Sequence, residues 1–342
     1  MSNVVLVTGA TGLLGRQVFN VFQHSGCLVV GQGYSRATPP TILKADLEKP
    51  EDIERLLDEV KPQIIIHCTR HPHFIFGVVH TALHLGDDSD QTGILGAANR
   101  YPDLCEQDPE AAHRVNVECS RALAQGASAR RAFLIYISTD YVFPGTEGEA
   151  PYEADAEPRP VNKYGELKRE GELAVLEATR DTGMGIVLRL PLLYGSATKN
   201  SESAVNSLID VIWKAQDEKA GIKMDDWALR YPTNTEDVAR VCRDIVIKYV
   251  KEMNRIKELP KILQFSSEDR MTKYEMCEKL AEVLGLSLAG MVRDQRGNDP
   301  NSPVKRPYDA HLSTKALQDL GINVKTMDFT AWWRRELGAY RK

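Results

Sequence analysis

The sequence predicts an α/β fold in which helices cover both faces of a parallel β-sheet. Three observations support this prediction. Short β-branched runs alternate with amphipathic stretches through the first 195 residues, a glycine-rich stretch follows the first run, and 342 residues are enough to bury a large core. Such strand–helix–strand units join parallel strands through right-handed crossovers. The expected architecture is a doubly wound parallel sheet.

Each element is expected from its own local pattern. Runs of buried β-branched residues predict strands at residues 4–10, 27–35, 63–68, 133–139, 185–195 and 262–267. Helical patterns predict helices at residues 13–26, 51–62, 111–129, 163–181, 235–253 and 271–286. Residues 297–307 are rich in proline and asparagine and are expected to form a loop.

The composition excludes several classes of protein. The formal net charge is −5, so no basic surface indicates a nucleic-acid partner. No apolar run approaches the ~18 residues of a membrane span, and the N-terminus lacks the pattern of a secretory signal. The six cysteines show no CxxC spacing and are expected to be reduced. We therefore expect a soluble protein of the cytoplasm, or alternatively the nucleus, without a membrane partner.

The stretch TGATGLLG follows the first expected strand and opens the first expected helix. Its glycines, Gly9, Gly12 and Gly15, have the spacing GxxGxxG. Glycine is needed because the turn is tight and the backbone must approach a pyrophosphate, which meets free N–H groups at the helix N-terminus. A tight turn without a ligand is the alternative. The succession of strand, glycines and helix favours a dinucleotide.

The second expected strand ends with GQGYSRA. A site for NAD usually has a carboxylate here that binds the ribose 2′-hydroxyl. This chain has Tyr34, Ser35 and Arg36 instead, and no acid before Asp46. A guanidinium beside a hydroxyl suits a 2′-phosphate, so we expect NADP(H) rather than NAD(H). The alternative is that Arg36 is only a solvated loop charge.

Two further stretches carry candidate catalytic residues. ISTDYVF ends the fourth expected strand and contains Thr139, whose hydroxyl is suited to hold a substrate carbonyl. YGELK places Tyr164 and Lys168 four residues apart, on one helix face. A neighbouring ammonium stabilises a tyrosine phenolate for acid–base work, while the cofactor supplies hydride. YxxxK alone is more often a surface pair, but its place after the glycine-rich unit favours catalysis.

These residues carry a family resemblance. The chain resembles the extended short-chain dehydrogenases/reductases along essentially its whole length outside residues 69–96. STDYVF, YGELK and RLPLLYG are similar to the branch that contains dTDP-4-dehydrorhamnose reductase and the regulatory beta subunit of methionine adenosyltransferase. MDDWALRYPT, at residues 224–233, resembles the regulatory subunits' Met-Asp-x-Trp-x-x-Arg-aromatic-Pro-Thr, whereas bacterial reductases read Asp-Gln-x-Gly-x-Pro-Thr. MTKYEM and RPYDAHLSTKALQDLGI indicate the same group.

The resemblance implies a domain organisation and a set of cofactor contacts. We expect a Rossmann domain at residues 1–192 and a smaller substrate-binding subdomain mainly at 193–342, with 232–264 returning to the Rossmann domain. The implied NADP contacts are Thr11, Gly12, Leu13 and Leu14 at the pyrophosphate, Tyr34, Ser35 and Arg36 at the 2′-phosphate, Asp46 and Leu47 by the adenine, Cys68 and Arg100 near the middle, Tyr164 and Lys168 at the ribose, and Leu193 by the nicotinamide.

Residues 69–96 interrupt the family pattern between Cys68 and Ala97. They form an insertion of 28 residues with four histidines, His71, His73, His80 and His84. A zinc site would need three or four ligands converging at fixed geometry, and a mobile apolar lid is a second alternative. Long loops in compact domains are uncommon and often carry no structure of their own. An in-frame insertion within a motif also resembles a translated intron, and this is the explanation that we favour. No metal site is therefore predicted.

Two functions remain in view. The first is an NADP-loaded, reductase-like regulatory subunit that docks on the methionine adenosyltransferase catalytic subunit and modulates S-adenosylmethionine biosynthesis. The second is an NADPH-dependent reductase that acts on a nucleotide-linked 4-keto sugar. The Thr, Tyr and Lys cannot separate these hypotheses, because the regulatory subunits retain similar residues. The resemblance of the C-terminal half favours the regulatory subunit.

Overall fold

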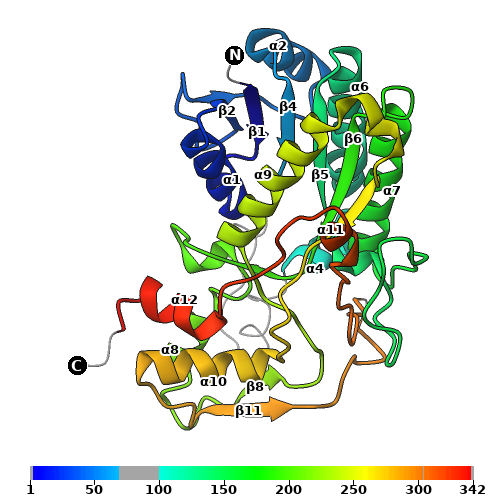
Figure 1. Ribbon diagram of the computed structural model, residues 1–342. Coiled ribbons are helices and arrows are strands. Elements are labelled where there is room, and N and C mark those ends of the chain that lie inside the picture. The colour runs from blue at the N-terminus through cyan, green and yellow to red at the C-terminus, as the bar shows by residue number, and fades with distance from the viewer. Residues whose placement is uncertain (1–2, 69–99, 303, 340–342) are drawn as a thin grey trace.

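The computed structural model describes residues 3–68, 100–302 and 304–339. Seven strands form one sheet in the order β10-β6-β5-β4-β1-β2-β3, and every neighbouring pair is parallel (Figure 1). The strands are β1 (Val4–Thr8), β2 (Leu28–Gly33), β3 (Ile42–Lys44), β4 (Ile64–His67), β5 (Phe133–Thr139), β6 (Gly185–Leu190) and β10 (Ile262–Gln264). The predicted doubly wound parallel sheet is confirmed.

The order of the strands places a switch point between β1 and β4. From β1 the chain continues outward through β2 and β3, and from β4 it continues in the opposite direction through β5, β6 and β10. In doubly wound sheets, ligands bind beyond the carboxyl ends of the strands at such a point. The glycine-rich turn after β1 therefore lies where a ligand is expected.

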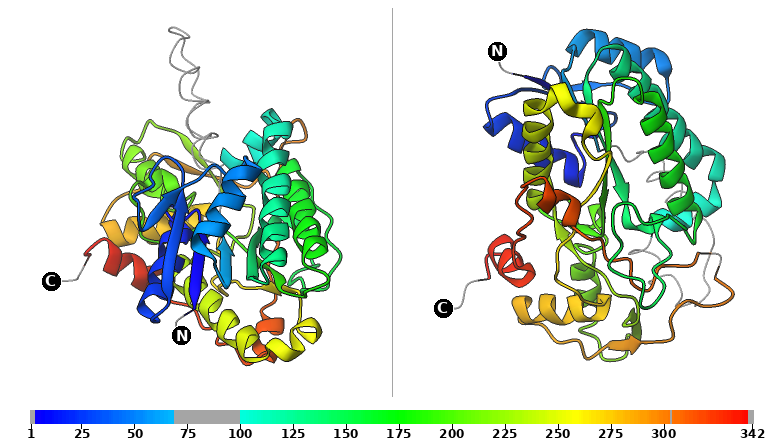
Figure 2. Two further views of the ribbon diagram at one scale, coloured as in Figure 1. Left: turned by 90° about the horizontal axis from the view of Figure 1, so that it is seen from above. Right: turned by 45° about the vertical axis from the view of Figure 1, so that its right-hand side comes forward.

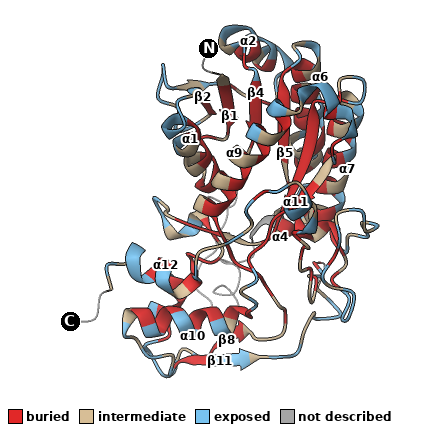
Figure 3. Ribbon diagram, viewed as in Figure 1, coloured by how far each residue is buried: buried red, intermediate tan, exposed pale blue. Residues whose placement is uncertain are grey.

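Both faces of the sheet are buried because successive side chains alternate. In β1, Val5 and Val7 pack into a hydrophobic cluster with α1 and α9, whereas Leu6 packs into another with α2, α6 and α7. The central strands β1, β4, β5 and β6 are buried along nearly all of their length (Figure 3), and Figure 2 shows the sheet between the two helical layers. The helices are α1 (Leu13–His24), α2 (Pro50–Val60), α6 (Cys119–Ala129), α7 (Lys163–Ala178) and α9 (Thr235–Lys251).

A smaller unit with its own hydrophobic cluster lies beyond the carboxyl ends of the strands (Figure 1). It contains α8 (Leu208–Lys214), α10 (Lys273–Leu284), α12 (Phe329–Glu336) and the parallel pair β8 (Ile222–Asp225) and β11 (Met291–Asp294). Trp332 and Trp333 of α12 pack around the ring of Tyr194. Tyr194 belongs to β7 (Leu193–Tyr194), which pairs with β9 (Thr233–Asn234) and connects the sheet to this unit.

The remaining elements are short. They are α4 (Arg100–Gln107), α5 (Pro109–His113), the π-helical turn η2 (Arg114–Glu118), the 3₁₀ turns η3 (Asp140–Val142), η4 (Asn200–Glu202) and η5 (Met253–Glu258), and α11 (Lys315–Asp319). No helix among the described residues is long and apolar enough to cross a bilayer.

The structure departs from the sequence-based expectations in several elements. The single strand expected at 185–195 is interrupted at Pro191, so that β6 and β7 belong to different sheets. The helix expected at 111–129 contains the π-helical turn η2. The sequence did not predict β3, β8 or β11, which are only three or four residues long, nor α4, α8 and α12. The division into domains at residues 192 and 193 stays a prediction, although β10 joins the large sheet.

Candidate functional site

The glycine-rich turn closes tightly on itself. Gly9 has φ +65°, which favours glycine, and the N–H of Gly12 donates to the carbonyl oxygen of Gly9 at 2.9 Å. A Cβ atom at Gly15 would lie 2.1 Å from that same oxygen, so a larger residue cannot fit without moving the turn. Leu13 and Leu14, which begin α1, are buried. The first N–H groups of the helix therefore form a cradle suited to a phosphate.

The turn is connected to the neighbouring strand ends. Gln32 of β2 accepts from the N–H of Gly9 at 3.0 Å and donates to the carbonyl of Ala45 at 2.8 Å. On the other side of the switch point, the N–H of Cys68 donates to the carbonyl of Thr8 at 3.3 Å. Cys68 is half-buried, and burial raises the pKa of its thiol well above the ordinary value. Cys68 is therefore a neutral group beside the turn.

Tyr34, Ser35 and Arg36 follow β2, which ends at Gly33, two residues before the predicted end of this strand. The Arg36 guanidinium is half exposed and donates to a carboxylate oxygen of Glu202 at 2.5 Å. Asp46 follows the edge strand β3, where its carboxylate accepts from the N–H of Glu48, and Leu47 is buried. A carboxylate therefore does lie beside the end of β2, and it belongs to Glu202. The local sequence pattern could not predict this contact, because Glu202 is far from β2 in the sequence.

The three candidate catalytic residues lie on neighbouring elements. Thr139 ends β5, and its hydroxyl accepts from the N–H of Tyr141 while donating to the carboxylate of Asp140 at 3.0 Å. Tyr164 and Lys168 both lie on α7, where the Tyr164 ring meets the Tyr141 ring edge-on. Tyr141 therefore contacts both Thr139 and Tyr164, and α7 packs Tyr164 beside the end of β5.

The ammonium of Lys168 is buried at the strand end. It donates to the carbonyl oxygen of Ile137 at 2.7 Å and lies 4.1 Å from the centre of the Tyr136 ring. Gly165, one residue after Tyr164, allows this close packing, because a Cβ atom there would lie 2.1 Å from the Tyr141 carbonyl. This packing fixes the position of Lys168 relative to β5.

A buried network supports this strand end from behind. Glu172 of α7 and Arg189 of β6 are fully buried and form an ion pair at 2.8 Å. Ser138, next to Thr139, donates to the same carboxylate at 2.6 Å, and Arg189 also donates to Gln264 of β10. We call these four residues the strand-end network. They connect α7 to three strands of the sheet.

His67 at the end of β4 is buried between two hydroxyl groups. Its Nδ1 lies 2.7 Å from the Thr8 hydroxyl and its Nε2 lies 3.3 Å from the Ser120 hydroxyl. Burial, followed by the nearby Lys168 ammonium, lowers the pKa of His67 to about 3. The ring is therefore neutral at physiological pH and links β1 to α6 through hydrogen bonds.

Sequence reasoning did not single out three residues near this site. Asn116 lies in the π-helical turn η2, and its carbonyl accepts from Ser120 at 3.0 Å. Such turns within helices are frequent at functional sites, but they leave no clear periodic signal in a sequence. Arg16 of α1 and Glu202 of η4 are 186 residues apart and form an ion pair at 2.6 Å. Only the tertiary fold brings that pair together.

Two predictions fall outside the described parts of the chain. The insertion at residues 69–96, with its four histidines, is not described, and neither is the side chain of Arg100, although Arg100 begins α4. Within residues 3–68, 100–302 and 304–339, no group of three or more His, Cys, Asp or Glu side chains is arranged to hold a metal ion.

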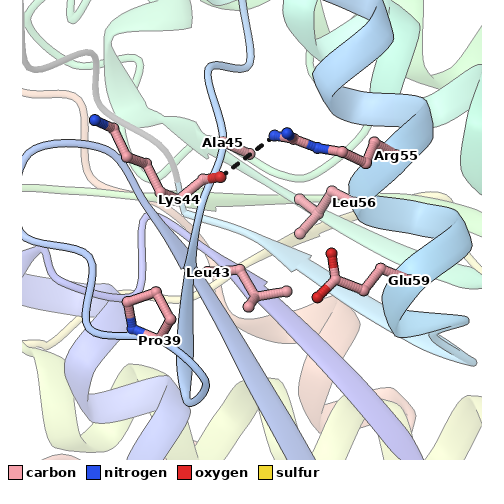
Figure 4. Close-up of a pocket in the computed structure, with 7 residues that line it drawn as sticks. All are labelled: Pro39, Leu43, Lys44, Ala45, Arg55, Leu56 and Glu59. Atoms are coloured by element: carbon pink, nitrogen blue, oxygen red, sulfur yellow. Dashed lines mark hydrogen bonds between the residues drawn. The ribbon is translucent and has the colours of Figure 1, made fainter.

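A hollow of about 240 Å³ lies elsewhere, between the edge strand β3 and α2 (Figure 4). Leu43 and Leu56 form its apolar side, and Arg55 reaches across to the carbonyl of Lys44 at 3.5 Å. None of the predicted site residues lines it. We therefore assign no function to this hollow, which lies at the edge of the sheet.

Known proteins resemble this chain along nearly its whole length. The family model described as "RmlD substrate binding domain" matches residues 2–74 and 84–339. Methionine adenosyltransferase 2 subunit beta of Rattus norvegicus is 37% identical over 327 residues, which cover 95% of this chain and 84% of the relative. The subunit beta of Danio rerio is 34% identical and is covered to 87%.

Solved structures support the same fold. The dTDP-4-dehydrorhamnose reductase of Bacillus anthracis in complex with NADP has a TM-score of 0.72, with 20% identity and coverage of 98% of this chain and 99% of that one. The fold predicted from the sequence, that of an extended short-chain dehydrogenase/reductase, is confirmed. The chain belongs to the RmlD substrate-binding domain family, within the group that includes methionine adenosyltransferase 2 subunit beta.

Proposed function

We propose that this protein is an NADP-binding regulatory subunit of methionine adenosyltransferase, which docks on the catalytic subunit and modulates S-adenosylmethionine biosynthesis. One observation carries the proposal: the 37% identity to a methionine adenosyltransferase 2 subunit beta along 95% of this chain. The similarity includes the C-terminal half, where the sequence differs from the pattern of bacterial reductases.

The residues around the switch point fit a nicotinamide dinucleotide. The glycine turn and the first turn of α1 would hold the pyrophosphate, because the turn closes tightly at Gly9 and Gly12 and leads directly into the first N–H groups of α1. Ser35 and Arg36 would bind a 2′-phosphate, which is why we propose NADP(H) rather than NAD(H). Tyr164 and Lys168 would lie at the nicotinamide ribose. When bound, the nicotinamide would supply hydride chemistry. A regulatory subunit would need only to bind the cofactor, without hydride transfer.

The remaining proposed contacts follow the same path. Asp46 and Leu47 would lie by the adenine, and Leu193 by the nicotinamide. Cys68 and Arg100 would lie near the middle of the cofactor. Their roles are carried over from the family resemblance and can be tested one at a time by substitution.

The test of docking uses the whole chain and the methionine adenosyltransferase catalytic subunit of the same organism. Sedimentation velocity of the mixture should show a new, faster species at micromolar concentrations, and the kinetics of S-adenosylmethionine formation should change in proportion to that species. Bovine serum albumin at equal concentration is the control for crowding. Two independent species and unchanged kinetics would rule out the regulatory assignment.

A reductase acting on a nucleotide-linked 4-keto sugar is the second candidate. Thr139, Tyr164 and Lys168 favour it, because Tyr164 and Lys168 contact the residues on either side of Thr139, at the end of β5. One contact opposes it: the Thr139 hydroxyl already donates its proton to Asp140 and would have to turn away to bind a carbonyl. NADPH oxidation that depends on a dTDP-4-keto sugar and is lost in Tyr164→Phe would establish this activity.

A further inference from the structure

Three charged side chains converge beside the end of β2. Arg16 and Arg36 donate to opposite oxygens of the Glu202 carboxylate, at 2.6 Å and 2.5 Å. We call these three residues the arginine cluster. Arg16 also donates to the carbonyl of Thr11 in the glycine turn at 2.9 Å. The cluster therefore joins the turn, the loop after β2 and η4.

Bonds that do not involve Arg36 hold the segment that carries Glu202. The Ser203 hydroxyl donates to the carbonyl of Leu193 at 2.8 Å, and the side-chain amide of Asn206 donates to the carbonyl of Gly195 at 2.9 Å. Arg16 adds a bond to the carbonyl of Ser196 at 3.2 Å. Loss of the Arg36 contact would therefore leave this segment attached to β7.

Glu202 is ionised where it meets the arginines. Its side chain is 15% exposed, and burial alone would raise its pKa, but hydrogen bonds from Arg16 and Arg36 outweigh that effect and lower the pKa. One carboxylate thus neutralises one of the two guanidinium charges, leaving a net charge of about +1 on the cluster at neutral pH.

We propose that Glu202 sets the cofactor preference of this protein by competing with the 2′-phosphate of NADP for Arg36. The inference rests on the proposed NADP site. A 2′-phosphate at Arg36 would replace the Glu202 carboxylate as the acceptor of the guanidinium hydrogen bond. NADP binding must then offset the loss of the Arg36–Glu202 pair, whereas NAD, which has no 2′-phosphate, leaves that pair intact.

The test is isothermal titration calorimetry of the full chain with NADP⁺ and with NAD⁺. Glu202→Gln removes the charge and keeps the size of the side chain. We expect NADP⁺ affinity to rise about threefold to tenfold, since the pair is partly solvated, and NAD⁺ affinity to stay within about twofold. Glu258→Gln is the matched control, because Glu258 is an exposed partner of Arg255 in η5 and its loss changes the net charge equally.

The double variant Arg36→Met/Glu202→Gln separates competition from general repulsion. Competition predicts that Glu202→Gln no longer changes NADP⁺ affinity once Arg36 is absent. A persistent gain in that background, or wild-type NADP⁺ affinity in Glu202→Gln alone, would overturn the role of Glu202 and leave the NADP site standing. Absence of binding of either cofactor to the wild type and to Glu202→Gln would overturn the proposed NADP site itself. Glu202→Gln should likewise raise the affinity for 2′,5′-ADP, which carries the 2′-phosphate, and leave the affinity for 5′-ADP, which lacks it, nearly unchanged.

Discussion

The two ends of the candidate dinucleotide site are built from charged residues in opposite environments. At the end of β5, Glu172 and Arg189 of the strand-end network are both 0% exposed. At the end of β2, Arg36 of the arginine cluster is 50% exposed. When a buried charge loses its partner, no water can take the partner's place, whereas water can solvate a half-exposed charge. We therefore expect the first end to control stability and the second to control which ligand binds.

The largest expected effect is on the strand-end network. Arg189→Met leaves the Glu172 carboxylate buried with one fewer charged partner and should lower the free energy of unfolding by about 3–5 kcal/mol. Urea denaturation monitored by tryptophan fluorescence measures it. The control is Arg169→Met, because Arg169 also bonds to Glu172, at 3.0 Å, but is 24% exposed. That change should cost less than about 1 kcal/mol; equal losses would contradict the comparison.

The second-largest effect is a pH dependence of the unfolding free energy, caused by His67, which is buried near the same strand end. The pKa of His67 is lowered to about 3, whereas an unfolded histidine titrates near ~6.5. Between these values the unfolded chain binds the additional proton, so the contribution is complete above pH ~6.5 and is lost as the pH falls. At pH 5 the loss is about 2 kcal/mol.

The variant His67→Gln should remove this dependence. The change in unfolding free energy between pH 7 and pH 5, measured by urea denaturation, should be smaller in the variant than in the wild type by about 2 kcal/mol. His24→Gln is the control, since His24 is exposed at the end of α1. If His67→Gln kept the wild-type dependence, the ring would not be the buried neutral group described here.

A smaller effect is expected where the buried end meets the proposed ligand. Lys168→Met removes the ammonium that bonds to the Ile137 carbonyl and would contact the ribose, so NADP⁺ affinity should fall about tenfold. Lys163→Met is a matched control five residues earlier on α7, because Lys163 pairs with Glu166 near the surface. Calorimetry that gives the two variants equal affinity would show that α7 does not face the cofactor.

The two ends also differ in how far the sequence predicted them. Gly9, Gly12 and Gly15, and the spacing of Tyr164 and Lys168, are local patterns, because a tight turn and a helix face each depend on residues close in sequence. The parallel sheet followed from the same local alternation. The order of its strands, with β10 at one edge, was not predicted from these patterns.

The contacts that the sequence did not predict join distant segments. Glu202 lies 166 residues after Arg36, and the pattern at the end of β2 therefore showed an arginine with no acid beside it. The strand-end network joins α7 to β6 and β10, and none of its members stands out by spacing. Short elements such as β3 and α8 were missed because three to seven residues carry too little periodic signal.

The smallest expected effect is a salt dependence confined to the exposed end. If the preference for NADP over NAD depends on Arg36, it should weaken as the ionic strength rises, because the screening length falls from about 10 Å at 0.1 M to about 3 Å at 1 M. Between 0.05 M and 0.5 M sodium chloride, the ratio of NAD⁺ to NADP⁺ dissociation constants should fall about threefold. Arg36→Met should start from a lower ratio and show almost no further change, which calorimetry at both salt concentrations can measure. Far-UV circular dichroism at both salt concentrations checks that the protein stays folded. A preference for NADP⁺ that persists unchanged at 0.5 M salt would place the 2′-phosphate in a buried setting, away from Arg36, and the contrast between the two ends would disappear.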